Sequence, residues 1–172
     1  MFQKERRGEV MNWFKPFRLI PQPLPEPVSI LYDETIFYNK FKQDLLKAKH
    51  KVIIESLFIA TRRLEVLKTV FEILVDGGIK VFVITRDPKE HDESISKQAE
   101  AGVRYFEVLG VQVLLCIGNH HRKLAIIDRK ILWEGSLNIL SQTKSREIMR
   151  RIDSKDMALE MFEFLRLNRF IY

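Results

Sequence analysis

Four polar residues in the second half of the chain have the types and spacing of a site that attacks a phosphate ester. His121 and Lys123 lie two residues apart, and Ser136 and Asn138 repeat this spacing further along. Alternate residues of a β-strand face the same side, so each pair can present its two side chains together. A neutral imidazole can attack phosphorus, while lysine, serine and asparagine side chains can stabilise the charge that develops on phosphate oxygens. These residues therefore predict phosphodiester chemistry.

Two short apolar segments must position these side chains. RKLAIID (122–128) and ILWEG (131–135) have the composition of strands and are joined by a tight turn at 129–130. A hairpin of this kind brings the two polar pairs together near the ends of adjacent strands. Asp128 falls at the end of the first strand, where the turn begins.

The chain before this hairpin alternates between amphipathic and fully apolar segments. Helices are expected at 33–50, 62–78, 92–109 and, after the hairpin, 156–170, and strands at 51–60, 79–86 and 111–117. Such alternation predicts an α/β fold with a mixed, mainly parallel sheet and helices on both faces. The final hairpin adds an antiparallel portion, and residues 141–151 are polar and basic.

Residues 1–32 differ from the rest and are expected to form an arm or linker outside the domain at 33–172. Five of the six prolines lie between residues 16 and 27, which excludes a helix or a central strand there. Trp13, Phe14 and Phe17 can pack on the domain or contact a partner. Alternatively, the arm packs over a sheet edge or across a dimer.

The overall charge favours a negatively charged partner. The chain has 29 Lys and Arg against 23 Asp and Glu, a net charge of +6, which suits nucleic acid or an anionic membrane surface. No apolar run is long enough to span a bilayer, and the first residues lack a signal-peptide pattern. The single cysteine, Cys116, lies in an apolar run and indicates a reducing compartment. We expect a cytoplasmic protein without stable membrane insertion.

The polar pairs belong to a longer pattern that resembles the HKD signature of the phospholipase D superfamily. The resemblance covers about residues 33–165 and includes one HxKxxxxD motif followed after six residues by GSxN. An acidic residue also lies where the family often carries one, thought to hydrogen-bond the catalytic histidine. The matching positions are His121, Lys123, Asp128, Gly135, Ser136, Asn138 and Glu147.

The resemblance implies a mechanism that uses two such motifs. One histidine attacks phosphorus to form a phosphohistidine, and the second protonates the leaving oxygen and then activates water; no metal or other cofactor is required. Asp128 is expected to support the motif rather than to contact substrate. Because this chain has one motif, the simplest solution is a twofold homodimer in which both copies of His121 meet. The pair would then titrate as a coupled unit.

Three further residues are candidates for supporting the site. Gly135 belongs to the motif. Glu55 lies within an apolar strand, where an unpaired carboxylate is costly, so it either pairs with a buried basic residue or lines the floor of the site. His120 could bind a metal with His121 and Asp128, but adjacent strand residues face opposite sides. An exposed or supporting His120 is favoured.

Basic residues around the expected site could form a groove for a polyanionic backbone, although solvated surface charge is the alternative. Several follow strands, where ligand sites of α/β proteins gather, and others follow the GSxN segment. The candidates are Arg62, Arg63, Arg86, Lys89, Lys144, Arg146, Arg150 and Arg151.

A nuclease acting on DNA, or less favourably on RNA, is the leading interpretation. The pattern resembles the endonuclease branch of the superfamily and also domains found beside helicases, so a helicase or recognition subunit is a candidate partner. One alternative is a phospholipid phosphodiesterase or transferase at a membrane surface. Another is a non-catalytic module that binds nucleic acid as a dimer.

Overall fold

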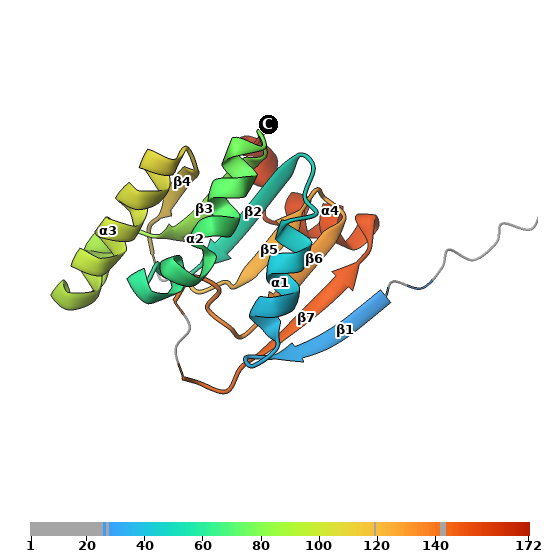
Figure 1. The fold of residues 1–172 in the computed structure, drawn as a ribbon, viewed down its shortest axis with the longest axis horizontal. Coiled ribbons are helices and arrows are strands. Elements are labelled where there is room, and N and C mark those ends of the chain that lie inside the picture. The colour runs from blue at the N-terminus through green and yellow to red at the C-terminus, as the bar shows by residue number, and fades with distance from the viewer. Residues whose placement is uncertain (1–25, 27, 119, 142–143) are drawn as a thin grey trace, which may run out of the picture.

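The computed structural model describes residues 26, 28–118, 120–141 and 144–172, and within them the chain forms one seven-stranded sheet with helices on both faces (Figure 1). The strands are β1 (Val28–Asp33), β2 (Lys51–Ser56), β3 (Lys80–Arg86), β4 (Gln112–Cys116), β5 (Leu124–Ile127), β6 (Ile131–Gly135) and β7 (Ile148–Asp153). The helices are α1 (Phe37–Leu45), α2 (Thr61–Asp76), α3 (Glu93–Leu109) and α4 (Lys155–Phe164), with short 3-10 turns η1 (Pro88–Glu90) and η2 (Leu167–Arg169). Trp13, Phe14 and Phe17 of the expected arm lie outside the described residues.

The sheet has the order β1-β7-β6-β5-β2-β3-β4. The expected α/β class and the helices on both faces are confirmed, but the sheet is mostly antiparallel. Only the pairings β2–β3 and β3–β4, among those described, are parallel. The hairpin β5–β6 pairs antiparallel with β2, and β7 and β1 extend the sheet in the same antiparallel manner. The parallel portion therefore covers only the segment in which strands and helices alternate.

Strands β7 and β1 are not expected from the sequence. The β7 segment IMRRID lies at the end of a basic stretch, and its two arginines hide the alternation of a strand. Residues 28–32, part of the predicted arm, belong to the edge strand β1 and pair with β7. These two strands extend the sheet beyond β6, the second strand of the hairpin that carries the polar residues.

Two apolar layers hold the sheet between its helices. One layer lies beneath α1, α2 and α3 and includes Phe41, Phe71 and Trp133. The other lies beneath α4 and includes Ile126 and Phe162. Figure 1 shows α1, α2 and α3 in front of the sheet and α4 behind it. Because alternate residues of β5 face opposite layers, all four residues of this short strand are buried.

A buried ion pair joins β7 to α1 and corrects one predicted nucleic-acid contact. The Asp44 side chain accepts hydrogen bonds from Arg151 Nε at 2.6 Å and from Trp133 Nε1 at 3.1 Å. Arg151 also lies 3.4 Å from Asp153 Oδ2 and is 9% exposed. Its charge is neutralised inside the fold, since Arg151 faces the α1 layer whereas Arg150 faces the other side. Arg151 is therefore not a surface contact for a polyanion.

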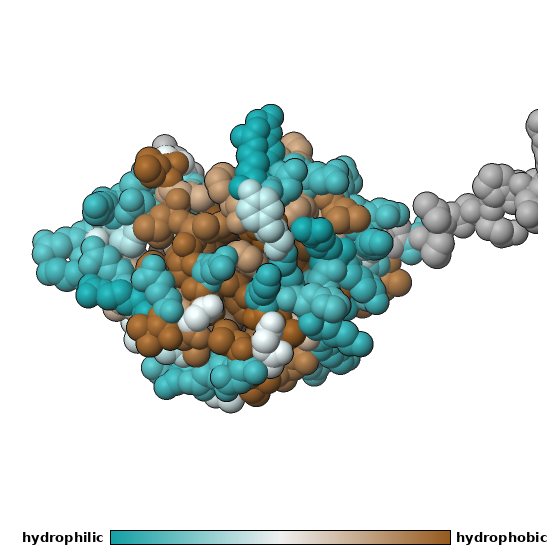
Figure 2. Space-filling view, turned by 90° about the horizontal axis from the view of Figure 1, so that it is seen from above, coloured by the Kyte–Doolittle hydropathy of each residue, from teal (hydrophilic) through white to brown (hydrophobic). Residues whose placement is uncertain are grey.

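Within the described part of the chain, none of the helices combines the length and the apolar character that crossing a bilayer requires. Viewed from above, the molecule has apolar surface in its middle, flanked by hydrophilic side chains on both sides (Figure 2).

Candidate active site

The hairpin and β7 bring the predicted polar residues to one edge of the sheet. His121 and Lys123 precede β5, Ser136 and Asn138 follow β6, and Glu147 precedes β7. Since β5, β6 and β7 are successively antiparallel, the start of β5, the end of β6 and the start of β7 coincide. All five residues line one open groove of about 870 Å³.

Gly135 allows β6 and β7 to approach closely at this edge. A Cβ atom on Gly135 would lie 2.2 Å from the Ile148 carbonyl oxygen and 2.9 Å from Met149 Cα. No side chain fits there without moving backbone. The reason for glycine in the motif is thus close strand packing, which sets where the next residue, Ser136, leaves the sheet.

Ser136 is held on β7 by two hydrogen bonds. Its backbone N–H donates to the Ile148 carbonyl at 3.0 Å, and its Oγ accepts from the Ile148 N–H at 3.2 Å. A hydroxyl that accepts in this way still has its own proton to donate. Ser136 is exposed in the groove, so that proton can reach a phosphate oxygen.

Asn138 lies in a segment that is anchored to β2. The Leu140 N–H donates to Ser56 Oγ at 3.1 Å, and the Ser141 N–H donates to the Asn138 carbonyl at 3.1 Å. The side-chain Oδ1 of Asn138 is buried and has no hydrogen-bond partner in the described structure. The anchored segment holds the amide group of Asn138 at the wall of the groove.

His121 and Lys123 contact each other directly. Lys123 Nζ lies 2.6 Å from His121 Nδ1 and donates to the His121 carbonyl at 2.6 Å. Because an ammonium group only donates, Nδ1 must act as the acceptor and the proton of a neutral ring lies on Nε2. Partial burial lowers the pKa of Lys123 from its usual value, and the negative charge of Glu147 acts against that shift.

Glu147 does not make the contact that the family resemblance implies. Its side chain forms no hydrogen bond with His121, both residues being among those described, and Lys123 occupies the ring nitrogen instead. The Glu147 backbone N–H donates to Glu34 Oε2 at 3.0 Å. In this arrangement the charge of Glu147 acts on Lys123.

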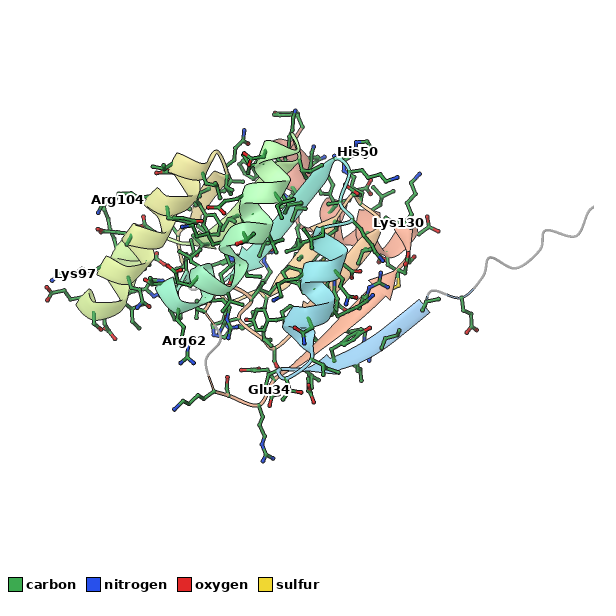
Figure 3. All side chains as sticks on the ribbon, viewed as in Figure 1. Glu34, His50, Arg62, Lys97, Arg104 and Lys130 are labelled. Atoms are coloured by element: carbon green, nitrogen blue, oxygen red, sulfur yellow. The ribbon has the colours of Figure 1, made fainter. Side chains whose placement is uncertain are left out.

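Asp128 does not join the other motif residues, because β5 separates it from His121. Its carboxylate accepts backbone N–H groups from Lys49 at 2.8 Å and from His50 and Lys51 at 2.9 Å each. In Figure 3, His50 lies at the upper edge of the sheet and Glu34, the partner of Glu147, at the lower edge. Asp128 therefore lies at the end of the sheet opposite the groove.

The alternative metal site built from His120, His121 and Asp128 is inconsistent with this separation. No group of three or more histidine, cysteine or carboxylate side chains within the described residues is arranged to hold a metal ion. The three candidate ligands are divided between the two ends of β5.

Glu55 is paired with a basic residue, as in one of its two predicted alternatives, but the side chain of this partner is half exposed rather than buried. It is fully buried, and its Oε1 accepts from Arg122 Nε at 2.7 Å. His120 Nε2 lies 2.9 Å from the same oxygen, although the angle is not that of a hydrogen bond. His120 is itself buried, at 8% exposure, so the expectation of an exposed His120 is excluded in favour of a supporting one.

Arg122 is not among the residues predicted from the sequence, yet it lines the groove beside His121. The sequence gives no direct signal for its pairing with Glu55, because this pairing depends on the register of β2 with β5, which places Glu55 opposite Leu124. On β5, side chains of the same parity as Leu124 face the α4 side, as Glu55 does. His120 and Arg122, the two basic side chains that flank His121, therefore lie on the same side as the buried acid.

The predicted basic groove is only partly formed. Arg150 lines the groove, and Arg146 lines an adjoining recess with Ser136 and Glu147. Arg62 and Lys144 are exposed. Four candidates have other surroundings: Arg151 pairs with Asp44, Arg63 lies 3.8 Å from the centre of the Tyr38 ring, Arg86 pairs with Glu90 at 3.0 Å, and Lys89 lines a separate recess with Glu100 and Arg104.

One wall of the groove is apolar. Leu31 on β1, Ile148 on β7 and Phe164 on α4 line it and are 53%, 57% and 80% exposed. Helix α4 covers only part of this face of the sheet, so these side chains have no cover within the described chain. The groove thus combines a polar edge with an exposed apolar side.

Comparisons with known proteins identify the family. The family model described as "Cardiolipin synthase, PLD-like domain" matches residues 41–166. Among solved structures, the chain is similar to NucT from Helicobacter pylori (TM-score 0.62, 19% identity, covering 81% of this chain and 93% of that one). It is also similar to Nuc, a phospholipase D family member from Salmonella typhimurium (TM-score 0.66, 17% identity, 81% and 91% covered).

A larger protein contains the same fold. Phosphatidylserine synthase from Haemophilus influenzae matches with a TM-score of 0.59 and 16% identity, and the alignment covers 84% of this chain and 39% of that one. No curated protein matches the sequence. With the family model covering most of the chain, the protein belongs to the phospholipase D-like family, and the sequence contains one HKD motif.

Proposed function

We propose that the protein is a metal-independent phosphodiesterase, and specifically a nuclease that prefers DNA to RNA, whose site is shared by two copies of the chain. The observation that carries the proposal is the assembly of His121, Lys123, Ser136 and Asn138 along one groove. Together they supply a nucleophile and donors for the non-bridging oxygens of a phosphodiester.

Substrate binding prepares His121 for attack by moving Lys123. A bound phosphate draws the Lys123 ammonium group from His121 Nδ1 to a phosphate oxygen. Nδ1 can then carry the ring proton, which leaves the lone pair on Nε2. Nε2 forms a bond to phosphorus while the bond to the leaving oxygen breaks, and the result is a phosphohistidine.

The second copy of His121 completes both steps. In its protonated form it gives a proton to the leaving oxygen, and in its neutral form it then accepts a proton from water. That water attacks phosphorus, breaks the phosphorus–nitrogen bond and restores the first histidine. The two rings must hold opposite protonation states when the leaving oxygen departs.

The apolar wall of the groove supports a twofold dimer. Leu31, Ile148 and Phe164 are uncovered beside the polar residues, and exposed apolar side chains beside a polar site are typical of an interaction surface. A second copy related by twofold symmetry would cover its own counterpart of this wall and bring the two histidines together.

The test is a cleavage panel on single- and double-stranded DNA and RNA with excess chelator. Cleavage should persist with chelator and be abolished by His121→Ala. A labelled oligonucleotide end should also remain attached to the wild-type protein after denaturation at alkaline pH, where phosphohistidine survives. Cleavage that requires an added metal ion, or that survives His121→Ala, would refute the mechanism.

Substrate preference follows from the type of contacts. Lysine, arginine and serine contacts to phosphates position a strand without reading its bases, so little intrinsic sequence preference is expected. A helicase or recognition subunit would be needed to direct the enzyme to a particular sequence.

The apolar wall is also the specific observation that favours a second candidate, a phospholipid phosphodiesterase or transferase at a membrane surface. Leu31 and Phe164 beside the groove could contact acyl chains. Binding to anionic vesicles and to DNA at the same salt concentration separates the two candidates. A non-catalytic module that binds nucleic acid would instead keep its function in His121→Ala.

A further inference from the structure

The buried carboxylate of Glu55 holds Arg122 at the groove, and neither residue has a role in the proposed reaction. Glu55 is fully buried in β2, and the Arg122 side chain, half exposed, reaches it from the loop that carries His121. Burying a carboxylate is costly unless it is paired. Arg122 supplies this pairing to Glu55 and at the same time lines the groove.

The contact uses only one edge of the guanidinium group. Arg122 donates through Nε to Glu55 Oε1 at 2.7 Å. In the described structure, no other acidic group pairs with the two terminal nitrogens of Arg122. Arg122 also lines the groove, so these nitrogens remain as a fork of donors, a geometry that matches phosphate oxygens.

Arg122 and Lys123 are directed to different parts of the groove. Lys123 turns toward the ring and carbonyl of His121, whereas Arg122 turns toward Glu55 on the neighbouring strand. Lys123 is thus placed for the phosphate that His121 attacks. Arg122 precedes Lys123 in the chain and lines the same groove.

We propose that Arg122 binds a phosphate adjacent to the scissile one, and that Glu55 is the positioning residue that holds Arg122 for this contact. The inference rests on the proposed nuclease function and deepens it. It makes the site selective for a chain of phosphates over an isolated phosphodiester such as a phospholipid headgroup. Because Glu55 already orders the arginine, less side-chain entropy is lost when the strand binds.

The test compares a polymer with a substrate that has a single phosphate. Steady-state kinetics of the full-length protein are measured on an oligonucleotide and on bis(p-nitrophenyl) phosphate for wild type, Arg122→Gln and Arg122→Lys. Losing one charge-assisted phosphate contact should lower the ratio of the two kcat/KM values about tenfold in Arg122→Gln. Arg122→Lys should recover part of this ratio, since it keeps the charge and loses the fork.

Salt dependence provides a second readout, one that a purely structural role would not change. Oligonucleotide binding is followed by fluorescence anisotropy in a His121→Ala background, so it does not depend on turnover. Each lost contact to single-stranded DNA should lower the slope of log K against log salt by about 0.7. In a dimer with two copies of Arg122 at the site, the slope should fall by about 1.4.

Two further variants control for charge and test positioning. Arg104→Gln removes an exposed arginine that pairs with Glu100 on α3, away from the groove, and should leave the ratio and the slope unchanged. Glu55→Gln should reproduce part of the Arg122→Gln effect. The double variant should be no worse than Arg122→Gln alone, since the two residues act through one contact.

The inference and the proposed function fail in different ways. Binding without cleavage of either substrate would refute the proposed function, and the salt slope would still decide whether Arg122 contacts a phosphate. An unchanged slope, an equal loss on both substrates, or dissociation of the dimer in Arg122→Gln would overturn the assignment of Arg122.

Discussion

Asp128 is a motif residue whose replacement should affect stability rather than chemistry. Its carboxylate accepts backbone N–H groups from Lys49 and His50, which precede β2, at 2.8 and 2.9 Å, and from Lys51, the first residue of β2, at 2.9 Å. It is also one of the few described non-glycine residues with positive φ, at 52°. The side chain therefore joins two chain segments, and the backbone conformation adds a second constraint that a substitution must meet.

The expected loss depends on which constraint a substitution breaks. Asp128→Asn keeps one oxygen acceptor and tolerates positive φ, so about 1 kcal/mol should be lost. Asp128→Gly removes all three hydrogen bonds but accepts the backbone conformation, and should cost about 2 kcal/mol because the freed N–H groups of Lys49 and His50 can reach water. Asp128→Ala adds about 1–2 kcal/mol of left-handed strain, for a total of about 3–4 kcal/mol.

Urea unfolding of the three variants should give the order Asn, Gly, Ala in increasing loss of the free energy of unfolding. Asp92→Asn is a suitable control, because Asp92 is exposed and its side chain makes no capping hydrogen bond. Cleavage by Asp128→Asn, measured where the protein is fully folded, should stay within a few-fold of wild type. Unchanged stability together with a hundredfold loss of activity would refute this reasoning and return Asp128 to the reacting groups.

Three further predictions concern the groove. Mixed dimers of wild-type and His121→Ala chains should be nearly inactive in a cleavage assay, since each reaction uses both rings; half activity would contradict a shared site. The lowered pKa of Lys123 means that its charge is lost at a lower pH than that of an ordinary lysine, so kcat/KM for an oligonucleotide should fall as pH rises toward the pKa of free lysine. Lys123→Arg should flatten this alkaline limb, and an identical limb would exclude Lys123 as its cause. Gly135→Ala should lower the free energy of unfolding by about 1–3 kcal/mol through overpacking against Ile148; wild-type stability would show that β7 can yield there.

The local features of the site could be predicted from the sequence because they depend on short spacings. The i, i+2 pairs and the tight turn between β5 and β6 are determined by neighbouring residues. The positions of His121, Lys123, Ser136 and Asn138 along one groove follow from that hairpin. The parallel portion of the sheet could also be predicted from the sequence, since its strands are largely apolar and alternate with helices.

Features that depend on distant pairing could not be predicted in the same way. The pairing of β1 with β7 joins segments more than a hundred residues apart, and neither segment has a strong strand pattern. Without β7, the two arginines of this strand could not be assigned to faces. Arg150 lines the groove, whereas Arg151 pairs with Asp44 in the core. One residue of register thus decides between a groove residue and a buried ion pair.

The HKD motif shows why closeness in sequence is a poor guide to closeness in space for strand residues. A strand rises about 3.3 Å per residue, so the stretch from His121 to Asp128 spans on the order of 20 Å. The same extension that separates them places one motif residue at each end of β5: His121 at the groove and Asp128 at the segment that leads from α1 into β2. Because β2 also carries Glu55, which holds Arg122 beside His121, both ends of β5 are tied to the same neighbouring strand. The contacts of Asp128 and of Arg122 therefore depend on the same pairing of β2 with β5, although the two residues do not contact each other.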